Sequence, residues 1–330
     1  MGIRVLKGGM MTTVQDLGRT GYQSQGFSVS GVMDVRSFKI ANLLLDNPEN
    51  EAVLEFTLIG PTLEFTSETI ISITGGDFRP QINGKPAKMY TAIYMHRGDI
   101  LTFGGARTGT RGYIAFSSYL DVPVVMGSRS TNIKCQIGGY KGRKLEDEDY
   151  IAFRAKRRYL PYYLSRSLDL DEFDQEKITL RVVMGPQEKM FTKEGRETFL
   201  NSEYTVTSEF DRMGCRLEGP FIAYKTTSDI ISDGIAFGSV QVPSHGKPII
   251  LLADRQTTGG YAKIATVVSV DIPKLVQRKT EQKVRFQAVS VEEAQKLLAD
   301  EMKELNDFRS QIYTPCKEAV SYTHLRAHET

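Results

Sequence analysis

The chain has 330 residues, of which 40% are hydrophobic and 25% are charged, a composition typical of a globular protein with room for two domains. The formal net charge of +2 is too small to indicate a nucleic acid or an acidic membrane surface as partner. No apolar stretch approaches the length of a transmembrane helix, so we expect no membrane partner.

The N-terminus and the cysteines indicate a cytoplasmic protein. Residues 1–18 lack the apolar core and cleavage site of a signal peptide. The three cysteines, Cys135, Cys215 and Cys316, are far apart and odd in number, which favours free thiols in a reducing compartment. Residues 321–330 resemble a translated sequencing adapter, and we exclude them as non-native. Only His96 and His245 then remain, so we predict no metal site.

The first predicted elements are a broken strand and a helix. Residues 3–14 have a strand pattern that two glycines interrupt. Asp34 is a good N-cap for the apolar residues that follow at helical spacing. This helix must end before Pro48, because the residue preceding a proline disfavours the helical conformation.

Residues 52–125 then predict several short strands separated by turns. Asn83-Gly84 is typical of a two-residue hairpin loop. Runs of this length with frequent turn residues indicate a sandwich or barrel rather than a parallel α/β sheet. We therefore predict a first β domain over residues 1–125.

The rest of the chain predicts a connecting segment and a second β domain. Residues 126–176 contain the loop Gly-Ser-Arg-Ser-Thr and form the predicted connection. Residues 177–310 again show short strands, and they close with a charged amphipathic helix. Ser290 and Glu293 form a capping box at the start of this helix.

The two predicted domains repeat each other. Residues 83–86 match residues 245–248, and the Gly-Tyr pair at 112–113 matches the pair at 260–261, each in the same order along the chain. The offsets cluster at roughly 150 to 160 residues, as an internal duplication would produce. A site between two related β domains is the natural cleft.

Four polar loops carry the candidate functional residues. Two of them place an acid near a base, namely Asp16 with Arg19 and Asp211 with Arg212. A third places hydroxyl groups beside an arginine: Ser128, Arg129, Ser130 and Thr131. The fourth lies between two apolar runs and contains Asp254, Arg255, Gln256, Thr257, Thr258, Gly259, Gly260 and Tyr261. Arginine offers a planar fork of donors for carboxylate or phosphate, and glycines let the backbone approach a ligand. The alternative interpretation is structural, with Arg–Asp pairs that brace loops and hydroxyls that cap helices.

Ten ordered motifs make the chain resemble a known family. They read TVQDLGRTGY, SGVMD, NPENEAVLE, ITGGD, VPVVMGSRST, GGYKGRKL, GPQ, DRMGCRLEG, VQVP and LLADRQTTGGYAKIATV, and they span most of the chain. These motifs resemble the family of the 5-oxoprolinase C subunit, also called KipA, allophanate hydrolase subunit 2 or the biotin-dependent carboxyltransferase family. The resemblance implies a mainly β protein with a few helices, built of two tandem cyclophilin-like β-barrel domains.

The same resemblance implies a function. It implies that the chain is the C subunit of an ATP-dependent 5-oxoprolinase and that it is inactive alone. The partners implied are a KipI-like B subunit and an A subunit, and the substrate is a small cyclic amide. ATP would be shared with the partner subunits. No P-loop motif and no biotin-carrier segment occur in the chain, so any ATP site is of another type.

Activation of a lactam by ATP requires donors around the phosphoryl oxygens and the substrate carboxylate. We predict Arg255, Gln256, Thr257 and Thr258 as catalytic. We predict that substrate or phosphate is bound by Ser128, Arg129, Ser130, Thr131, Arg212, Arg19, Gly259, Gly260 and Tyr261. Asp16, Asp211 and Asp254 are predicted to orient the arginines.

Two other functions stay open. One is a carboxyltransferase of the allophanate-hydrolase type that acts on urea-like amides, with biotin carried on another chain. The other is a KipA-type regulator that binds a kinase inhibitor related to the B subunit.

Overall fold

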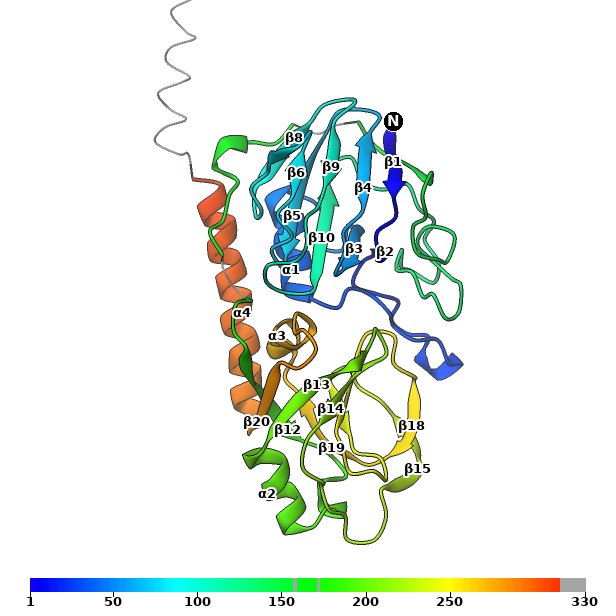
Figure 1. Cartoon of the computed structure of the whole chain (residues 1–330), viewed down its shortest axis with the longest axis vertical. Coiled ribbons are helices and arrows are strands. Elements are labelled where there is room, and N and C mark those ends of the chain that lie inside the picture. Colours follow the sequence, from blue (N-terminus) through cyan, green and yellow to red (C-terminus); the bar gives the residue numbers. More distant parts are fainter. Residues whose placement is uncertain (157–158, 171–172, 315–330) are drawn as a thin grey trace, which may run out of the picture.

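The computed structural model describes residues 1–156, 159–170 and 173–314, and the excluded tail and Cys316 lie outside them. It shows two β domains stacked along the long axis, with helix α4 running beside both (Figure 1). The prediction of a mainly β protein with few helices is confirmed.

The first domain consists of two sheets that pack face to face. Their strand orders are β11-β1-β4-β9-β6-β7 and β2-β3-β10-β5-β8. The strands are β1 (Gly2–Lys7), β2 (Met11–Gln15), β3 (Val53–Thr57), β4 (Thr62–Phe65), β5 (Thr69–Gly75), β6 (Gln81–Ile82), β7 (Lys85–Pro86), β8 (Ala92–Met95), β9 (Ile100–Thr102), β10 (Arg111–Phe116) and β11 (Tyr150–Ala152).

Both faces of the second sheet are covered. One face packs on the first sheet through residues such as Ile3, Phe56 and Ile114. The other face packs on α1 (Val35–Leu44) through Phe38 and Tyr113. Strands β5 and β10 are therefore buried along their whole length.

The predicted elements of this domain are confirmed. The glycine-interrupted segment forms β1 and β2, and Asn83-Gly84 turns between β6 and β7. The Asp34 side chain accepts a hydrogen bond from the Ser37 amide and so caps α1. Strand β11, which falls within the segment 126–176, pairs with β1 and so belongs to the first sheet.

The second domain is a closed barrel with strand order β12-β19-β16-β17-β14-β13-β20. Its strands are β12 (Lys177–Met184), β13 (Glu203–Phe210), β14 (Gly214–Glu218), β16 (Ser239–Gln241), β17 (Ile249–Leu251), β19 (Lys263–Val267) and β20 (Lys283–Ala288). A separate two-stranded ribbon of β15 (Asp229–Gly234) and β18 (Thr258–Tyr261) stands beside it. Alternate residues of β12 and β13 point into the barrel core, which is the period of two expected of a strand.

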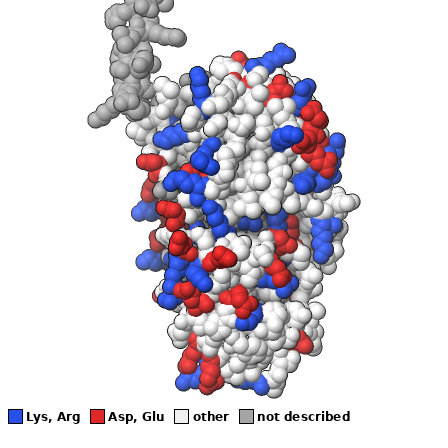
Figure 2. Space-filling model, in the orientation of Figure 1, with Lys and Arg blue, Asp and Glu red and all other residues white. Residues whose placement is uncertain are grey.

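Three helices accompany the barrel, namely α2 (Lys193–Asn201), α3 (Ile272–Val276) and α4 (Val291–Ile312). The predicted capping box of Ser290 and Glu293 is present at the start of α4. The helix then returns to the first domain, where Glu304 pairs with Arg36 at 3.0 Å and Ile312 is fully buried. Figure 2 shows acidic and basic side chains interspersed along this edge of the molecule.

Helix α4 is the longest helix of the described residues. Neither it nor any other helix in this part of the chain combines the length and the apolar character needed to cross a bilayer.

Candidate functional site

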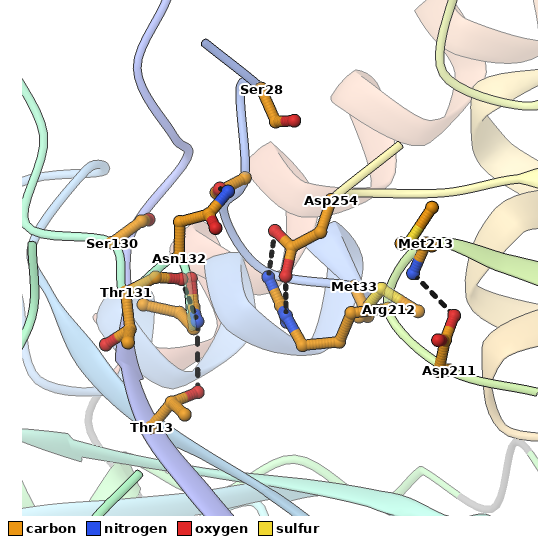
Figure 3. A network of polar contacts seen from close by, with 12 residues as sticks. Thr13, Ser28, Met33, Ser130, Thr131, Asn132, Asp211, Arg212, Met213 and Asp254 are labelled. Carbon is orange, nitrogen blue, oxygen red and sulfur yellow. Dashed lines mark hydrogen bonds and ion pairs between the residues drawn. The ribbon is translucent and has the colours of Figure 1, made fainter. Parts of the chain in front are cut away.

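Loops from both domains meet at the junction between them, and they carry most of the predicted site residues (Figure 3). The Ser30 amide of the first domain donates to the Ala253 carbonyl of the second at 3.1 Å. The Ser28 hydroxyl donates to the Arg255 carbonyl at 2.7 Å. Main-chain and hydroxyl hydrogen bonds thus join the two domains around the candidate site.

Arg212 is the centre of the junction. Its Nε donates to Asp254 Oδ2 at 2.9 Å, its Nη1 contacts Glu55 Oε1, and its Nη2 donates to the Gly31 carbonyl at 2.5 Å. Only 12% of the Arg212 side chain, 11% of Asp254 and 3% of Glu55 are exposed. One guanidinium therefore joins carboxylates from both domains in a largely water-excluded triad of Arg212, Asp254 and Glu55.

The charge of this triad follows from its surroundings. Burial disfavours the charged form of Arg212, but the carboxylates of Asp254 and Glu55 outweigh that effect and raise its pKa above the ordinary value. Glu55 Oε2 also accepts hydrogen bonds from the Tyr113 hydroxyl at 2.9 Å and the Met33 amide at 2.8 Å. Burial and then the negative charge of Glu55 raise the pKa of Tyr113, so this hydroxyl stays a donor.

Asp16 organises the Gly-Ser-Arg-Ser-Thr loop. Its Oδ1 accepts from the hydroxyls of Ser128 and Ser130 at 2.6 Å and 2.5 Å, and its Oδ2 accepts from the Arg129 amide at 2.6 Å. The Thr131 hydroxyl donates to the Val14 carbonyl at 3.0 Å. These hydroxyls, which we predicted to bind a ligand, are engaged in holding their own loop.

Arg19 lies beside this loop with unused donors. It is 1% exposed, and its Nη2 contacts the Ser130 carbonyl. Its Nε and Nη1 have no hydrogen-bond partner within the described residues. Burial lowers the pKa of Arg19, although Asp16 and Asp254 oppose the change. Gly138 leaves room for the guanidinium, since a Cβ at that position would lie 2.6 Å from Nη2.

Arg255 faces away from the triad. Its Nε donates to the Ile235 carbonyl at 3.0 Å and its Nη1 to the Leu252 carbonyl at 3.2 Å, while the guanidinium lies over the Phe237 ring. Burial lowers the pKa of Arg255. The guanidinium that we predicted to be the leading catalytic group thus braces the end of the barrel.

The other residues of that loop lie further out. Gln256 and Thr258 are exposed, and Thr257 is half-buried. Residues 258–261 form β18 of the ribbon, with the Tyr261 side chain exposed, rather than the continuous polar loop that the sequence predicts.

The three predicted orienting aspartates have different partners. Asp254 orients Arg212, not its neighbour Arg255. Asp211 accepts from the amides of Met213 and Gly214 at 2.7 Å and 3.1 Å, so it shapes its own turn (Figure 3). Asp16 orients hydroxyls and an amide of the Gly-Ser-Arg-Ser-Thr loop.

Two buried polar residues of the junction were absent from the sequence prediction. Glu55 is the second carboxylate of the triad, and its signal was an acid inside the apolar strand β3, all but the last residue of which is buried. Asn132 is 2% exposed and donates to the Ser30 hydroxyl at 3.0 Å. Asn132 directly follows the Gly-Ser-Arg-Ser-Thr loop, and nothing in the sequence pattern marked it as a buried residue.

The described residues contain no group of three or more His, Cys, Asp or Glu side chains arranged to hold a metal ion.

The comparisons with known proteins agree with this two-domain arrangement. The family model described as "Carboxyltransferase domain, subdomain A and B" matches residues 25–288. The chain is 33% identical to the 5-oxoprolinase C subunit of Escherichia coli over 308 residues, covering 91% of this chain and 96% of that protein. It is 34% identical to the protein of the same name from Haemophilus influenzae over 285 residues, covering 86% of this chain and 90% of that protein.

Solved structures support the same fold. The urea amidolyase of K. lactis superposes with a TM-score of 0.86 at 29% identity. The match covers 93% of this chain but 20% of that much longer protein.

Proposed function

The chain belongs to the carboxyltransferase domain family, subdomains A and B, and from this membership we propose that it is the C subunit of an ATP-dependent 5-oxoprolinase. Acting with the A and B subunits, it would open the lactam of 5-oxoproline to glutamate while ATP is hydrolysed. The supporting comparison is the alignment with two 5-oxoprolinase C subunits over nearly their full length.

The observation that carries the proposal is the triad of Arg212, Asp254 and Glu55 at the domain junction. Its carboxylates come from different domains, so the site is complete only when both domains are in place. Arg212 holds Asp254 by a hydrogen bond of 2.9 Å, and Asp254 keeps part of its surface accessible. An oriented carboxylate of this kind can accept a proton from water or from a substrate nitrogen.

Arg19 supplies the complementary donors. A buried guanidinium with two nitrogen atoms, Nε and Nη1, that lack a hydrogen-bond partner among the described residues fits an anionic oxygen, such as a substrate carboxylate or a phosphoryl oxygen. When bound, ATP would activate the lactam by phosphorylating its oxygen. In this scheme Arg19 binds the anion, Asp254 accepts the proton and Arg212 positions Asp254.

The test is the replacement of Asp254 by Asn in a complex with the cognate A and B subunits. Asp254→Asn keeps the shape of the side chain but removes its basicity. We expect 5-oxoproline-dependent ADP release to fall by about 100-fold or more, the usual contribution of a general base. Asp211→Asn is the matched control, since Asp211 only accepts two main-chain amides and should leave turnover near the wild-type rate.

Full turnover by Asp254→Asn would refute the role of this carboxylate. If the assembled complex, with the wild-type chain, releases no ADP when given 5-oxoproline, the oxoprolinase assignment itself fails.

One observation favours a second candidate function. The close superposition with urea amidolyase fits a carboxyltransferase that acts on a urea-like amide, with biotin on another chain. Biotin-dependent carboxyl transfer to urea, measured with a biotinylated carrier protein, would support this alternative over lactam opening.

A further inference from the structure

A cavity lies in the first domain, away from the junction. Its volume is about 590 Å³, which is within the range of small-molecule sites. It opens at the end of β5, beside the β6–β7 hairpin, and segments 87–90, 107–108 and 168–170 form its remaining sides. None of the residues of the triad lines it, and neither does Arg19.

Basic side chains form one wall of this cavity. Arg79 donates from Nε and Nη2 to the Gly105 carbonyl at 3.2 Å and 3.1 Å, which fixes its guanidinium at the cavity wall. Lys88 is exposed on the adjacent segment. Within the described residues, no salt bridge joins the Arg79 or Lys88 side chain to a carboxylate, although the charge of Arg79 contributes to lowering the pKa of Asp77.

One carboxylate of the cavity wall, Asp77, already has partners. Asp77 pairs with Arg107 Nε at 2.6 Å and accepts from the Arg79 amide at 2.9 Å. It therefore ties the two loops of the wall together. Among the described residues that line the cavity, Arg79 and Lys88 then supply positive charge, and Asp169 is a further acidic group.

The floor of the cavity is apolar. Tyr90, Leu168 and Phe173 line it and are 6%, 2% and 6% exposed. The Tyr90 hydroxyl donates to the Gly75 carbonyl at 3.0 Å and accepts from the Gly75 amide at 3.1 Å. Tyr90 and Arg79 both have positive φ, at 53° and 47°, a conformation that is uncommon for residues other than glycine.

We propose that this cavity binds a nucleoside phosphate. Its phosphate would lie on Arg79 and Lys88, its base on the apolar floor, and a sugar hydroxyl would donate to Asp169. The site is independent of the triad, so it would bind this ligand whether or not the chain takes part in opening a lactam.

The experiment is calorimetric titration of the full chain with AMP. Arg79→Asn removes the cation while asparagine still tolerates positive φ, and Lys88→Met removes the other cation at similar length. Each should weaken AMP binding by about 10-fold or more, the loss expected for a charge-assisted hydrogen bond. Arg97→Ala, which removes an exposed cation outside the cavity, and Asp254→Asn should bind AMP as the wild type does.

Inorganic phosphate and adenosine test the phosphate contact and the base contact separately. Both should bind much more weakly than AMP, because each lacks one of the two contacts. Equal binding of phosphate and AMP would refute the apolar contact with the base. The absence of saturable AMP binding, or equal binding by Arg79→Asn, Lys88→Met and Arg97→Ala, would overturn the site. Thermal unfolding of each variant checks that a loss of binding is not a loss of fold.

Discussion

Arg212 and Arg255 lie on neighbouring loops of the second domain, yet their surroundings differ. Arg212 faces two carboxylates, one from each domain, and they raise its pKa. Arg255 faces the main-chain carbonyls of Ile235, which follows ribbon strand β15, and Leu252, which follows barrel strand β17, and burial lowers its pKa. The surroundings of Arg212 concentrate charge at the junction, whereas the hydrogen bonds of Arg255 stabilise a loop. A buried arginine in a motif is therefore not by itself a sign of catalysis.

The largest expected effect comes from removing Arg212. Arg212→Met leaves Asp254 and Glu55 without their shared cation, and Glu55 is almost fully buried. We expect a loss of about 3–5 kcal/mol in the free energy of unfolding, the usual result of breaking a buried pair. Urea denaturation followed by circular dichroism measures it.

The same experiment has a built-in control. Adding Glu55→Gln to Arg212→Met removes one of the orphaned charges, so part of the lost stability should return. No recovery in the double variant would mean that Arg212 contributes through packing rather than through its charge.

The next effect concerns Asp271, a fully buried carboxylate in the second domain. It accepts from Arg181 Nη2 at 2.6 Å and from Lys274 Nζ at 2.7 Å. Burial acts to raise the pKa of Asp271, but these partners outweigh it and hold the pKa below the ordinary value. Asp271→Asn should lower the free energy of unfolding by about 2 kcal/mol at neutral pH.

The depressed pKa of Asp271 predicts the direction in which stability changes with pH. Because the pKa of Asp271 is depressed in the folded protein, its contribution is fully present above about pH 4, the ordinary range of Asp, and is lost as the pH falls through the folded-state value. The wild type should therefore lose stability on acidification more steeply than Asp271→Asn. Parallel stability curves for the two proteins would contradict this assignment.

Arg255 should show a smaller effect on stability than Arg212. Arg255→Met removes the side-chain donor of the Ile235 carbonyl and one of the two donors of the Leu252 carbonyl, which keeps the Arg255 main-chain amide, at a cost of about 1–2 kcal/mol. Thermal unfolding of Arg255→Met beside Arg212→Met measures the difference. An Arg255 variant as destabilised as the Arg212 variant would remove the distinction between the two arginines.

The smallest predicted effect is at the start of α4. Ser290→Ala removes the hydroxyl that accepts from the Glu293 amide at 3.1 Å. We expect a loss of about 1 kcal/mol, typical of an N-cap. Chemical denaturation measures it, and Ser310→Ala near the end of the same helix is the control, because its hydroxyl donates only to the helix backbone.

Local features of the fold were predictable from the sequence. The cap at Asp34, the hairpin at Asn83-Gly84 and the capping box of Ser290 and Glu293 involve groups only a few residues apart. Apolar runs bounded by turns similarly predicted β domains. Ordered motifs along most of the chain indicated the family, which the comparisons confirm.

The site itself depended on long-range contacts. Arg212 and Glu55 are 157 residues apart, and Ser128 and Asp16 are 112 apart. The sequence placed Asp254 beside Arg255, but the fold turned Arg255 toward the barrel and brought Arg212 to Asp254.

By itself the sequence determined most of the strands, the N-terminal caps of α1 and α4, and the family, because these follow from backbone propensities, hydrogen bonds between near neighbours and ordered motifs. Only the tertiary structure decided which carboxylate meets which arginine. That choice depends on how two domains pack and on which buried charges must be paired when water is excluded.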